Sequence, residues 1–290
     1  MITEHRRSGI RFALAAMCLV FVAACSELRD DLPSASSAER KIHPAGWKDT
    51  ASGEFHGTAV RQAKWEMKSC QSCHGQNYRG GVSGISCTTC HTDAGGPESC
   101  STCHGSTNPA PPRDISKNTA TSARGVGAHQ THIRGTTRAA NAVCTDCHKV
   151  PSSTYEAGHL DSELPAEVEF LGFRSSKSTT GFTPTYSSAT GTCSNNYCHG
   201  NFTNGNPTNA VTWSGFASTA AACGTCHGDP NKATLAERAL PKTSANGGTH
   251  PDLTNCSTCH GDVVNASLSF VNPSKHINGK LNVFGTERDF

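Results

Sequence analysis

The sequence predicts a chain that is mostly coil, with short helices and few short strands, wrapped around bulky groups that replace an ordinary apolar core. Hydrophobic residues make up only 35% and aromatic residues 6% of the 290 residues, whereas globular domains are roughly 45–50% apolar. In their place the chain holds 16 Cys, 15 His and 28 Gly. A chain this poor in apolar side chains needs disulfides, metals or cofactors to hold it together.

The charge of the chain gives little indication of a macromolecular partner. Charged residues make up 17% of the sequence and the formal net charge is +2. The low charge argues against a disordered polyelectrolyte tail. It also provides no basic surface of the kind that nucleic acid requires, so we expect no nucleic acid among the partners.

The first 24 residues have the pattern of an export signal. Basic residues precede an apolar stretch at 12–24, which is too short to span a bilayer. The run at 22–25 fits a bacterial lipobox and predicts lipidation of Cys25. The alternative is an ordinary signal followed by an incidental Cys. Because Ser26 follows, rather than Asp, the lipoprotein rule favours the outer membrane, and residues 25–50 are predicted to be a polar tether.

Fourteen further cysteines form seven pairs, and a His directly follows the second Cys of every pair. Six sites read C-x-x-C-H, and the fifth has four residues between its cysteines. In chain order the sites are Cys70 and Cys73 with His74, Cys87 and Cys90 with His91, Cys100 and Cys103 with His104, Cys144 and Cys147 with His148, Cys193 and Cys198 with His199, Cys223 and Cys226 with His227, and Cys256 and Cys259 with His260.

This pattern predicts seven covalently bound c-type haems. C-x-x-C-H is the attachment signature of haem c, because two thiols on one face of a helical turn can bond to one porphyrin. The next His then reaches the iron as its proximal ligand. Structural zinc and a disulfide framework are the alternatives, but neither needs a His after every pair. Thioredoxin-like chemistry needs one C-x-x-C in a βαβ context, not seven. The longer fifth site requires a bulged turn.

Seven histidines remain for the other side of the seven irons. The candidate distal ligands are His43, His56, His129, His132, His159, His250 and His276. Since Met67 is the only Met after the export signal, we expect ligation by two histidines throughout. An iron held on both sides has no open position for a substrate. The sequence therefore predicts an electron carrier rather than an enzyme, with a multihaem reductase that has one open haem as the alternative.

Local patterns around the distal candidates predict short elements. His129 and His132 are three residues apart, so on a helix they can serve two neighbouring haems. Alternating residues at 166–170 and 281–284 predict short strands after His159 and His276. His43 is the weakest candidate because it lies in the predicted tether. The tryptophans Trp47, Trp65 and Trp213 are expected to pack on porphyrin edges rather than to relay electrons.

These observations together predict the fold class of a multihaem cytochrome c, with helical turns at the attachment sites and a core of stacked haems. Such a chain should not fold without its cofactors. The spacing of the sites predicts a four-haem region at 51–172 and a three-haem region at 173–290.

The stretch from 127 to 290 resembles a known family. Gly127-Ala-His129-Gln-Thr-His132, the fourth and fifth attachment sites, Trp213-Ser-Gly and His276-Ile-Asn-Gly are similar to the CxxxxCH/CxxCH-domain cytochromes of metal-reducing bacteria such as Geobacter. The resemblance implies electron transfer at the outer membrane to an extracellular metal oxide or metal ion. The partners it implies are other multihaem cytochromes or a porin–cytochrome conduit. Some relatives polymerise into filaments, which is a further alternative, and a CxxxxCH site can stay empty without its dedicated attachment machinery.

Overall fold

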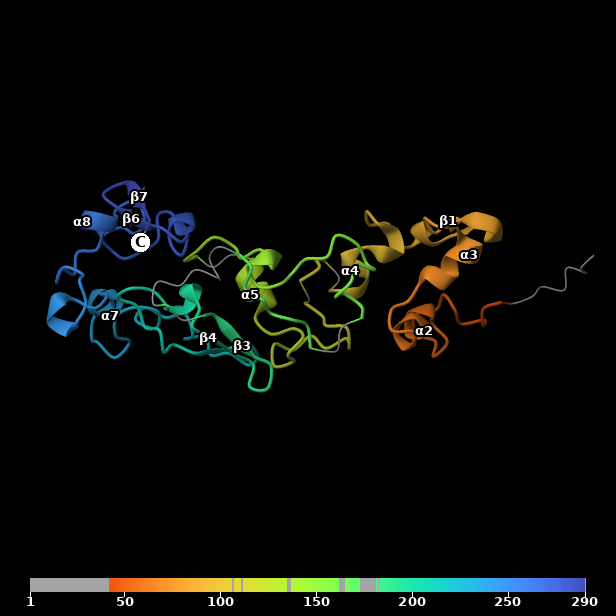
Figure 1. Cartoon of the computed structure of the whole chain (residues 1–290), viewed down its shortest axis with the longest axis horizontal. Coiled ribbons are helices and arrows are strands. Elements are labelled where there is room, and N and C mark those ends of the chain that lie inside the picture. Colours follow the sequence, from red (N-terminus) through yellow and green to blue (C-terminus); the bar gives the residue numbers. More distant parts are fainter. Residues whose placement is uncertain are drawn as a thin grey trace, which may run out of the picture. The chain divides into compact units, whose positions relative to one another are not determined.

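The computed structural model describes residues 42–105, 107–110, 112–134, 137–161, 165–172, 181 and 183–289. The predicted export signal, the predicted lipidation site Cys25 and most of the tether lie outside these residues. Within them the chain is mostly turns and coil, with short helices and short antiparallel strands (Figure 1). This architecture is the one that the composition predicts.

The chain divides into two compact units, one ending at Glu66 and one beginning at Met67. In the first unit, turns between residues 44 and 55 lead into α2 (His56–Gln62), and the ring of His43 stacks on Trp47 with the centroids 4.5 Å apart. In the second unit, hydrogen bonds join residues before position 172 to residues after it. One example is the bond from Trp213 Nε1 to the Arg124 carbonyl, 2.8 Å long. The division expected near residue 172 stays a prediction.

The helices are single turns or little more, and those at attachment sites carry the cysteines. The longest helix among the described residues has seven residues, too few for a helix to be stable alone in water. The α-helices are α2, α3 (Gln71–His74), α4 (Cys100–Cys103), α5 (His129–Ile133), α7 (Leu235–Ala239) and α8 (Ser257–His260). The 3₁₀ turns are η2 (Lys68–Cys70), η3 (Gly81–Ser83), η4 (Cys87–Thr89), η5 (Gly96–Glu98), η6 (Cys144–Asp146), η7 (Tyr197–His199), η8 (Ser244–Asn246) and η9 (Pro273–Lys275).

Within the described part of the chain, three small antiparallel sheets tie parts of the second unit together. They are β1 (Arg79–Gly80) with β2 (Ile85–Ser86), then β3 (Thr185–Ser187), β4 (Thr192–Ser194) and β5 (Val211–Thr212), and finally β6 (Leu281–Val283) with β7 (Thr286–Arg288). In the three-stranded sheet Cys193 lies on the central strand, opposite Tyr186 on one side and Val211 on the other.

One of the two predicted strands is correct and the other is wrong. Residues 281–283 form β6, which pairs with β7. Residues 166–170 are coil, because their backbone groups bond to the fourth attachment turn and not to a strand. The N–H of Glu169 donates to the Cys147 carbonyl, 2.9 Å, and the Glu167 carbonyl faces the imidazole of His148. Phe170 then takes a left-handed conformation with φ of 51°.

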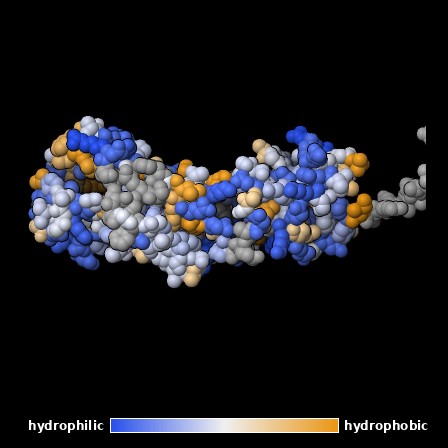
Figure 2. All heavy atoms as spheres, viewed as in Figure 1, coloured by the Kyte–Doolittle hydropathy of each residue, from blue (hydrophilic) through white to orange (hydrophobic). Residues whose placement is uncertain are grey.

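The described residues form no ordinary apolar core. Their buried hydrophobic side chains are few and scattered, namely Met67, Tyr78, Ala110, Val126, Ala128, Phe170, Tyr197 and Val263. Large apolar side chains such as Val82 and Phe284 are instead exposed, by 89% and 69%. Figure 2 shows hydrophilic residues over much of the visible face, with hydrophobic residues in scattered places. The polypeptide therefore depends on other groups for its cohesion.

Candidate functional site

Five of the seven attachment sites lie on a helical turn, as predicted, and at the fifth site such a turn covers Cys198 and His199 but not Cys193. In four of them the backbone N–H of the His donates to the carbonyl of the first Cys, at 2.8–3.0 Å, which closes one turn. These are the sites ending in His91, His104, His148 and His260. One turn therefore places both thiols and the imidazole close together, as covalent attachment of one porphyrin requires.

The fifth and sixth sites differ from the others in backbone conformation. At the fifth site Cys193 lies on β4, Asn195 takes a φ of 57°, and the side chain of Asn196 accepts from the N–H of Cys198 at 2.8 Å. The two extra residues are thus accommodated by a bulge between strand and turn. At the sixth site Gly224 has a φ of 96°, and a Cβ there would lie 2.5 Å from the backbone nitrogen of Pro230.

No disulfide joins the fourteen cysteines of the attachment sites, so they form no disulfide framework. They are Cys70, Cys73, Cys87, Cys90, Cys100, Cys103, Cys144, Cys147, Cys193, Cys198, Cys223, Cys226, Cys256 and Cys259. Burial raises the pKa of several, to about 12 for Cys147 and about 11 for Cys193. Burial thus favours the neutral form of these two thiols, and the bond of each cysteine to a porphyrin stays a prediction.

The second thiol of a site is presented in more than one setting. Cys73 lies on α3 and Cys259 on α8, and both are half-buried, whereas Cys90 directly follows η4 and is exposed. All three precede the predicted proximal His by one residue. Among the described residues, no group of three or more His, Cys, Asp or Glu has the arrangement of a metal cage.

Ten histidines of the second unit lie in five pairs, and each pair joins a predicted proximal ligand to a predicted distal one. The ring centroids of the two members are 6.1–6.4 Å apart in every pair. The pairs are His104 with His159 (6.1 Å), His129 with His148 (6.3 Å), His132 with His199 (6.1 Å), His227 with His276 (6.4 Å) and His250 with His260 (6.3 Å).

This separation fits one iron between two imidazoles. A metal–imidazole bond is about 2.0–2.1 Å long and the ring centre lies about 1.1 Å behind the nitrogen, so opposite ligands of one metal have ring centres about 6.3 Å apart. Two imidazoles in direct van der Waals contact lie closer, as the 4.5 Å stack of His43 on Trp47 illustrates. The separation of the paired rings is therefore compatible with one metal between them.

The hydrogen bonds of the imidazoles leave the correct nitrogen available. In ten of the described histidines Nδ1 lies 2.6–3.0 Å from a backbone carbonyl, which can only accept, so Nδ1 carries the hydrogen and Nε2 keeps its lone pair. The carbonyls belong to Trp47 for His56, Ile85 for His74, Val126 for His129, Ala128 for His132, Glu167 for His148, Thr154 for His159, Ala239 for His227, Pro251 for His250, Asn282 for His260 and Arg138 for His276.

Burial keeps three imidazoles neutral, two of them among these ten. It lowers the pKa of His129, His199 and His227 to about 4, with neighbouring imidazoles adding to the effect. A neutral imidazole with a free Nε2 is the form that binds a metal. The donor set and its geometry thus fit haem iron.

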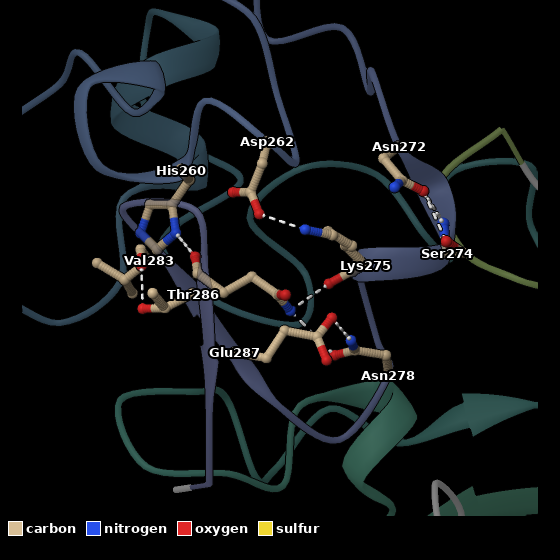
Figure 3. A network of polar contacts seen from close by, with 10 residues as sticks. His260, Asp262, Asn272, Ser274, Lys275, Asn278, Val283, Thr286 and Glu287 are labelled. Atoms are coloured by element: carbon tan, nitrogen blue, oxygen red, sulfur yellow. Dashed lines mark hydrogen bonds and ion pairs between the residues drawn. The ribbon is translucent and has the colours of Figure 1, made fainter.

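A polar network ties the seventh attachment turn to the sixth distal ligand. Figure 3 shows the surroundings of His260, whose Nδ1 donates to the Asn282 carbonyl at 2.6 Å. The side chain of Asn282 donates to the Lys275 carbonyl at 2.7 Å, and Lys275 forms an ion pair with Asp262 at 2.7 Å. Because His276 follows Lys275, one network supports both histidines.

The predicted ligands of the first two haems are divided between the two units. In the second unit Nδ1 of His74 lies 2.9 Å from the Ile85 carbonyl and 3.0 Å from the Ser83 hydroxyl. In the first unit His56 bonds to the Trp47 carbonyl and His43 stacks on the ring of Trp47. The pairing of His74 and His91 with these two histidines stays a prediction.

Sequence reasoning missed the carbonyl groups that orient the imidazoles. They are backbone atoms, so no residue type marks them, and some come from far along the chain. The acceptor for His276 is Arg138, whose guanidinium in turn donates to the Ala221 carbonyl at 2.7 Å. Trp213, expected on a porphyrin edge, packs against the rings of His129 and His132.

Comparison with known proteins supports the assignment of the Cys and His motifs to haem attachment. Residues 192–227 match the family model described as the Geobacter CxxxxCH...CXXCH motif, which spans the fifth attachment site and ends at His227 of the sixth. A search of curated proteins and a search of solved structures each return no match. No helix among the described residues has the length and apolar character needed to cross a membrane.

The motif and its geometry define the chain as a multihaem c-type cytochrome, which binds haem covalently and transfers electrons. Its residues 192–227 are similar to the Geobacter CxxxxCH...CXXCH family, so the predicted resemblance is confirmed for that segment.

Proposed function

We propose that this chain carries electrons through seven covalently bound haems, each held by two histidines. The observation that carries the proposal is the set of five histidine pairs at one common separation near that of opposite ligands on a metal. When bound, each haem iron supplies one-electron redox chemistry. The cysteines of the seven motifs hold the porphyrins, and the histidine that follows each motif is the proximal ligand.

The role of the paired histidines is to close both faces of the iron. Their carbonyl hydrogen bonds hold the rings in place, so no coordination position is left for oxygen, nitrite or peroxide. Two neutral imidazoles favour ferric iron more than a Met/His pair does. We therefore infer low reduction potentials and an electron carrier, not a reductase.

Contacts between consecutive attachment sites support a row of haems that follows the order of the sequence. Each of the first six attachment sites interacts with the next one through a hydrogen bond or an electrostatic interaction; between the second and third sites the partner is Asp93, which lies two residues after the second site. These contacts are Cys87 with Cys70, Ser101 with Asp93, His104 with His148, Cys147 with Cys193, Asn209 with both His199 and Cys226, and His227 with His250 and His260.

We further propose that the protein is an outer-membrane lipoprotein anchored through Cys25. The support is the lipobox-like run before that residue and the Ser that follows it. Electrons would pass between partner cytochromes or a porin–cytochrome conduit and an extracellular metal oxide or metal ion, as in the cytochromes that the chain resembles. Acylation of Cys25 in intact protein, found by mass spectrometry, tests the anchor; an unmodified or absent Cys25 contradicts it.

Two measurements on the purified holoprotein test the proposed function. The intact mass should correspond to the processed chain with seven haems, and fewer additions would contradict the count. Carbon monoxide added to the dithionite-reduced protein should then leave the haem spectrum unchanged on mixing. A rapid change at one haem would contradict a pure carrier and favour the reductase with one open site.

A further inference from the structure

Trp213 contacts the distal histidines of two different haem sites at once. Its ring centroid lies 4.6 Å from that of His129, edge-on at 87°, and 5.7 Å from that of His132, nearly parallel at 26°. The two histidines lie three residues apart on α5, whereas Trp213 follows β5 in the segment that carries the fifth and sixth attachment sites. One indole therefore packs against both rings from outside their helix.

The indole is itself fixed on several sides. Its Nε1 donates to the Arg124 carbonyl at 2.8 Å, and its backbone N–H donates to the Gly191 carbonyl at 2.6 Å. A Cβ on residue 127 would collide with the indole ring, so only Gly127, which has a φ of 45°, allows this approach. Residues 124–127 lead directly into α5, so the indole is held by the loop that positions the two histidines.

We propose that Trp213 is a positioning residue that fixes the ring planes of His129 and His132, the distal ligands of the fourth and fifth haems. The proposal rests on the proposed function, since it assumes that both histidines bind iron. The ring planes differ by 31° between His129 and His148 and by 74° between His132 and His199. The indole thus holds one pair close to parallel and the other close to perpendicular.

Ring planes have a direct spectroscopic consequence. The angle between two axial imidazoles decides how their π orbitals overlap with the iron d orbitals, and axial ligation is one of the levers by which a protein tunes haem. In ferric low-spin haem, near-parallel rings give a rhombic electron paramagnetic resonance signal. Near-perpendicular rings give a strongly anisotropic signal with a large maximum g value. A residue that sets these planes is therefore visible in the spectrum.

The chain offers a matched control in the sixth site. The rings of His227 and His276 are also near-perpendicular, at 78°, and His276 packs against Phe270 with centroids 4.7 Å apart. Phe270 therefore packs against the predicted distal ligand of the sixth haem, as Trp213 packs against that of the fifth. Replacing each aromatic residue should alter a different part of the same strongly anisotropic signal.

The experiment compares low-temperature spectra of oxidised holoprotein for the wild type, Trp213→Leu, Trp213→Phe and Phe270→Leu. Trp213→Leu should shift or broaden part of the strongly anisotropic signal and part of the rhombic signal. Phe270→Leu should alter a different part of the anisotropic signal. Trp213→Phe keeps an aromatic face but loses the bond to the Arg124 carbonyl, so its spectrum should lie between those of the wild type and Trp213→Leu.

The intact mass of every variant separates failure of this proposal from failure of the proposed function. If Trp213→Leu and Trp213→Phe retain all haems and their spectra equal that of the wild type, Trp213 does not set the ring planes. If Trp213→Leu loses haem, the test depends on Trp213→Phe alone. A Trp213→Phe spectrum equal to that of the wild type then overturns the proposal. A wild-type protein without low-spin signals from histidine-ligated haem would instead overturn the proposed function.

Discussion

Removal of His132 should open the fifth haem and no other. This residue lies 6.1 Å from His199 between ring centroids, and its Nδ1 donates to the Ala128 carbonyl at 2.9 Å. In His132→Ala the remaining Cβ cannot reach the iron, so the position about 2.0–2.1 Å from the metal becomes free for a small ligand. We expect the reduced variant to bind one carbon monoxide per chain, where the wild type binds none.

The cost in stability can be worked from the same contacts. The lost hydrogen bond to the Ala128 carbonyl contributes about 0.5–1.5 kcal/mol, and the lost ring contact with Trp213 about 0.5–1.5 kcal/mol. Loss of the iron bond adds to both. The variant should therefore keep its covalent haems but unfold more readily than the wild type, at a lower denaturant concentration.

The assay is a carbon monoxide titration followed in the Soret band, with Thr131→Ala as the matched control. Thr131 is exposed on the same helix and neighbours His132, so its truncation should leave ligation unchanged. Added imidazole should occupy the open position of His132→Ala and restore the spectrum of the wild type. If His132→Ala retains all haems and binds no more carbon monoxide than Thr131→Ala, the assignment of His132 to an iron is refuted.

Three further changes have expected outcomes. Cys198→Ala together with Cys193→Ala should lower by one the number of haems found from the intact mass. An unchanged number of haems would show that the fifth site is empty in the wild type. Gly224→Ala should lose the sixth haem more often than Gly215→Ala, because both glycines have positive φ but only a Cβ at position 224 would lie 2.5 Å from a backbone atom, the nitrogen of Pro230. The strain alone costs about 1–2 kcal/mol, and equal haem retention by mass would contradict the role of the close approach. Thr234→Ala should destabilise α7 by about 0.5–2 kcal/mol, because its hydroxyl accepts from the Glu237 N–H at 3.2 Å. The Glu237 carboxylate accepts from Thr234, which lowers the pKa of Glu237. Its contribution should be present above the unfolded pKa of about 4.3 and be lost as the pH falls through the lower folded pKa. Circular dichroism of wild type and variant between pH 7 and pH 3 checks both points, and a difference between them that is the same at all pH values would contradict the role of Glu237.

The fold class could be predicted from the sequence because its cause is compositional. Few apolar side chains and many Cys, His and Gly exclude an ordinary core. The attachment turns could also be predicted, since spacing within one turn is a local property. The segment 281–283 became a strand because β7 follows at once to pair with it, whereas 166–170 found its hydrogen-bond partners in Cys147 and His148.

The candidate ligands could be predicted as a set but their pairing could not. Residue type identifies an imidazole, yet His276 lies beside His227 only because the carbonyl of Arg138 and the network around Asn282 hold its segment there. These are contacts between residues distant in sequence and made largely by backbone atoms. A single sequence contains no pattern for them, so the five histidine pairs emerge only from the structure.

Electron paramagnetic resonance with spin quantitation on the fully oxidised holoprotein tests the central claim most directly. If two histidines ligate every iron, all ferric haem should be low spin, with both rhombic and strongly anisotropic signals and a total spin count equal to the number of haems found by mass. A high-spin ferric signal that integrates to one haem or more would contradict the claim that the histidine pairs close both faces of the irons.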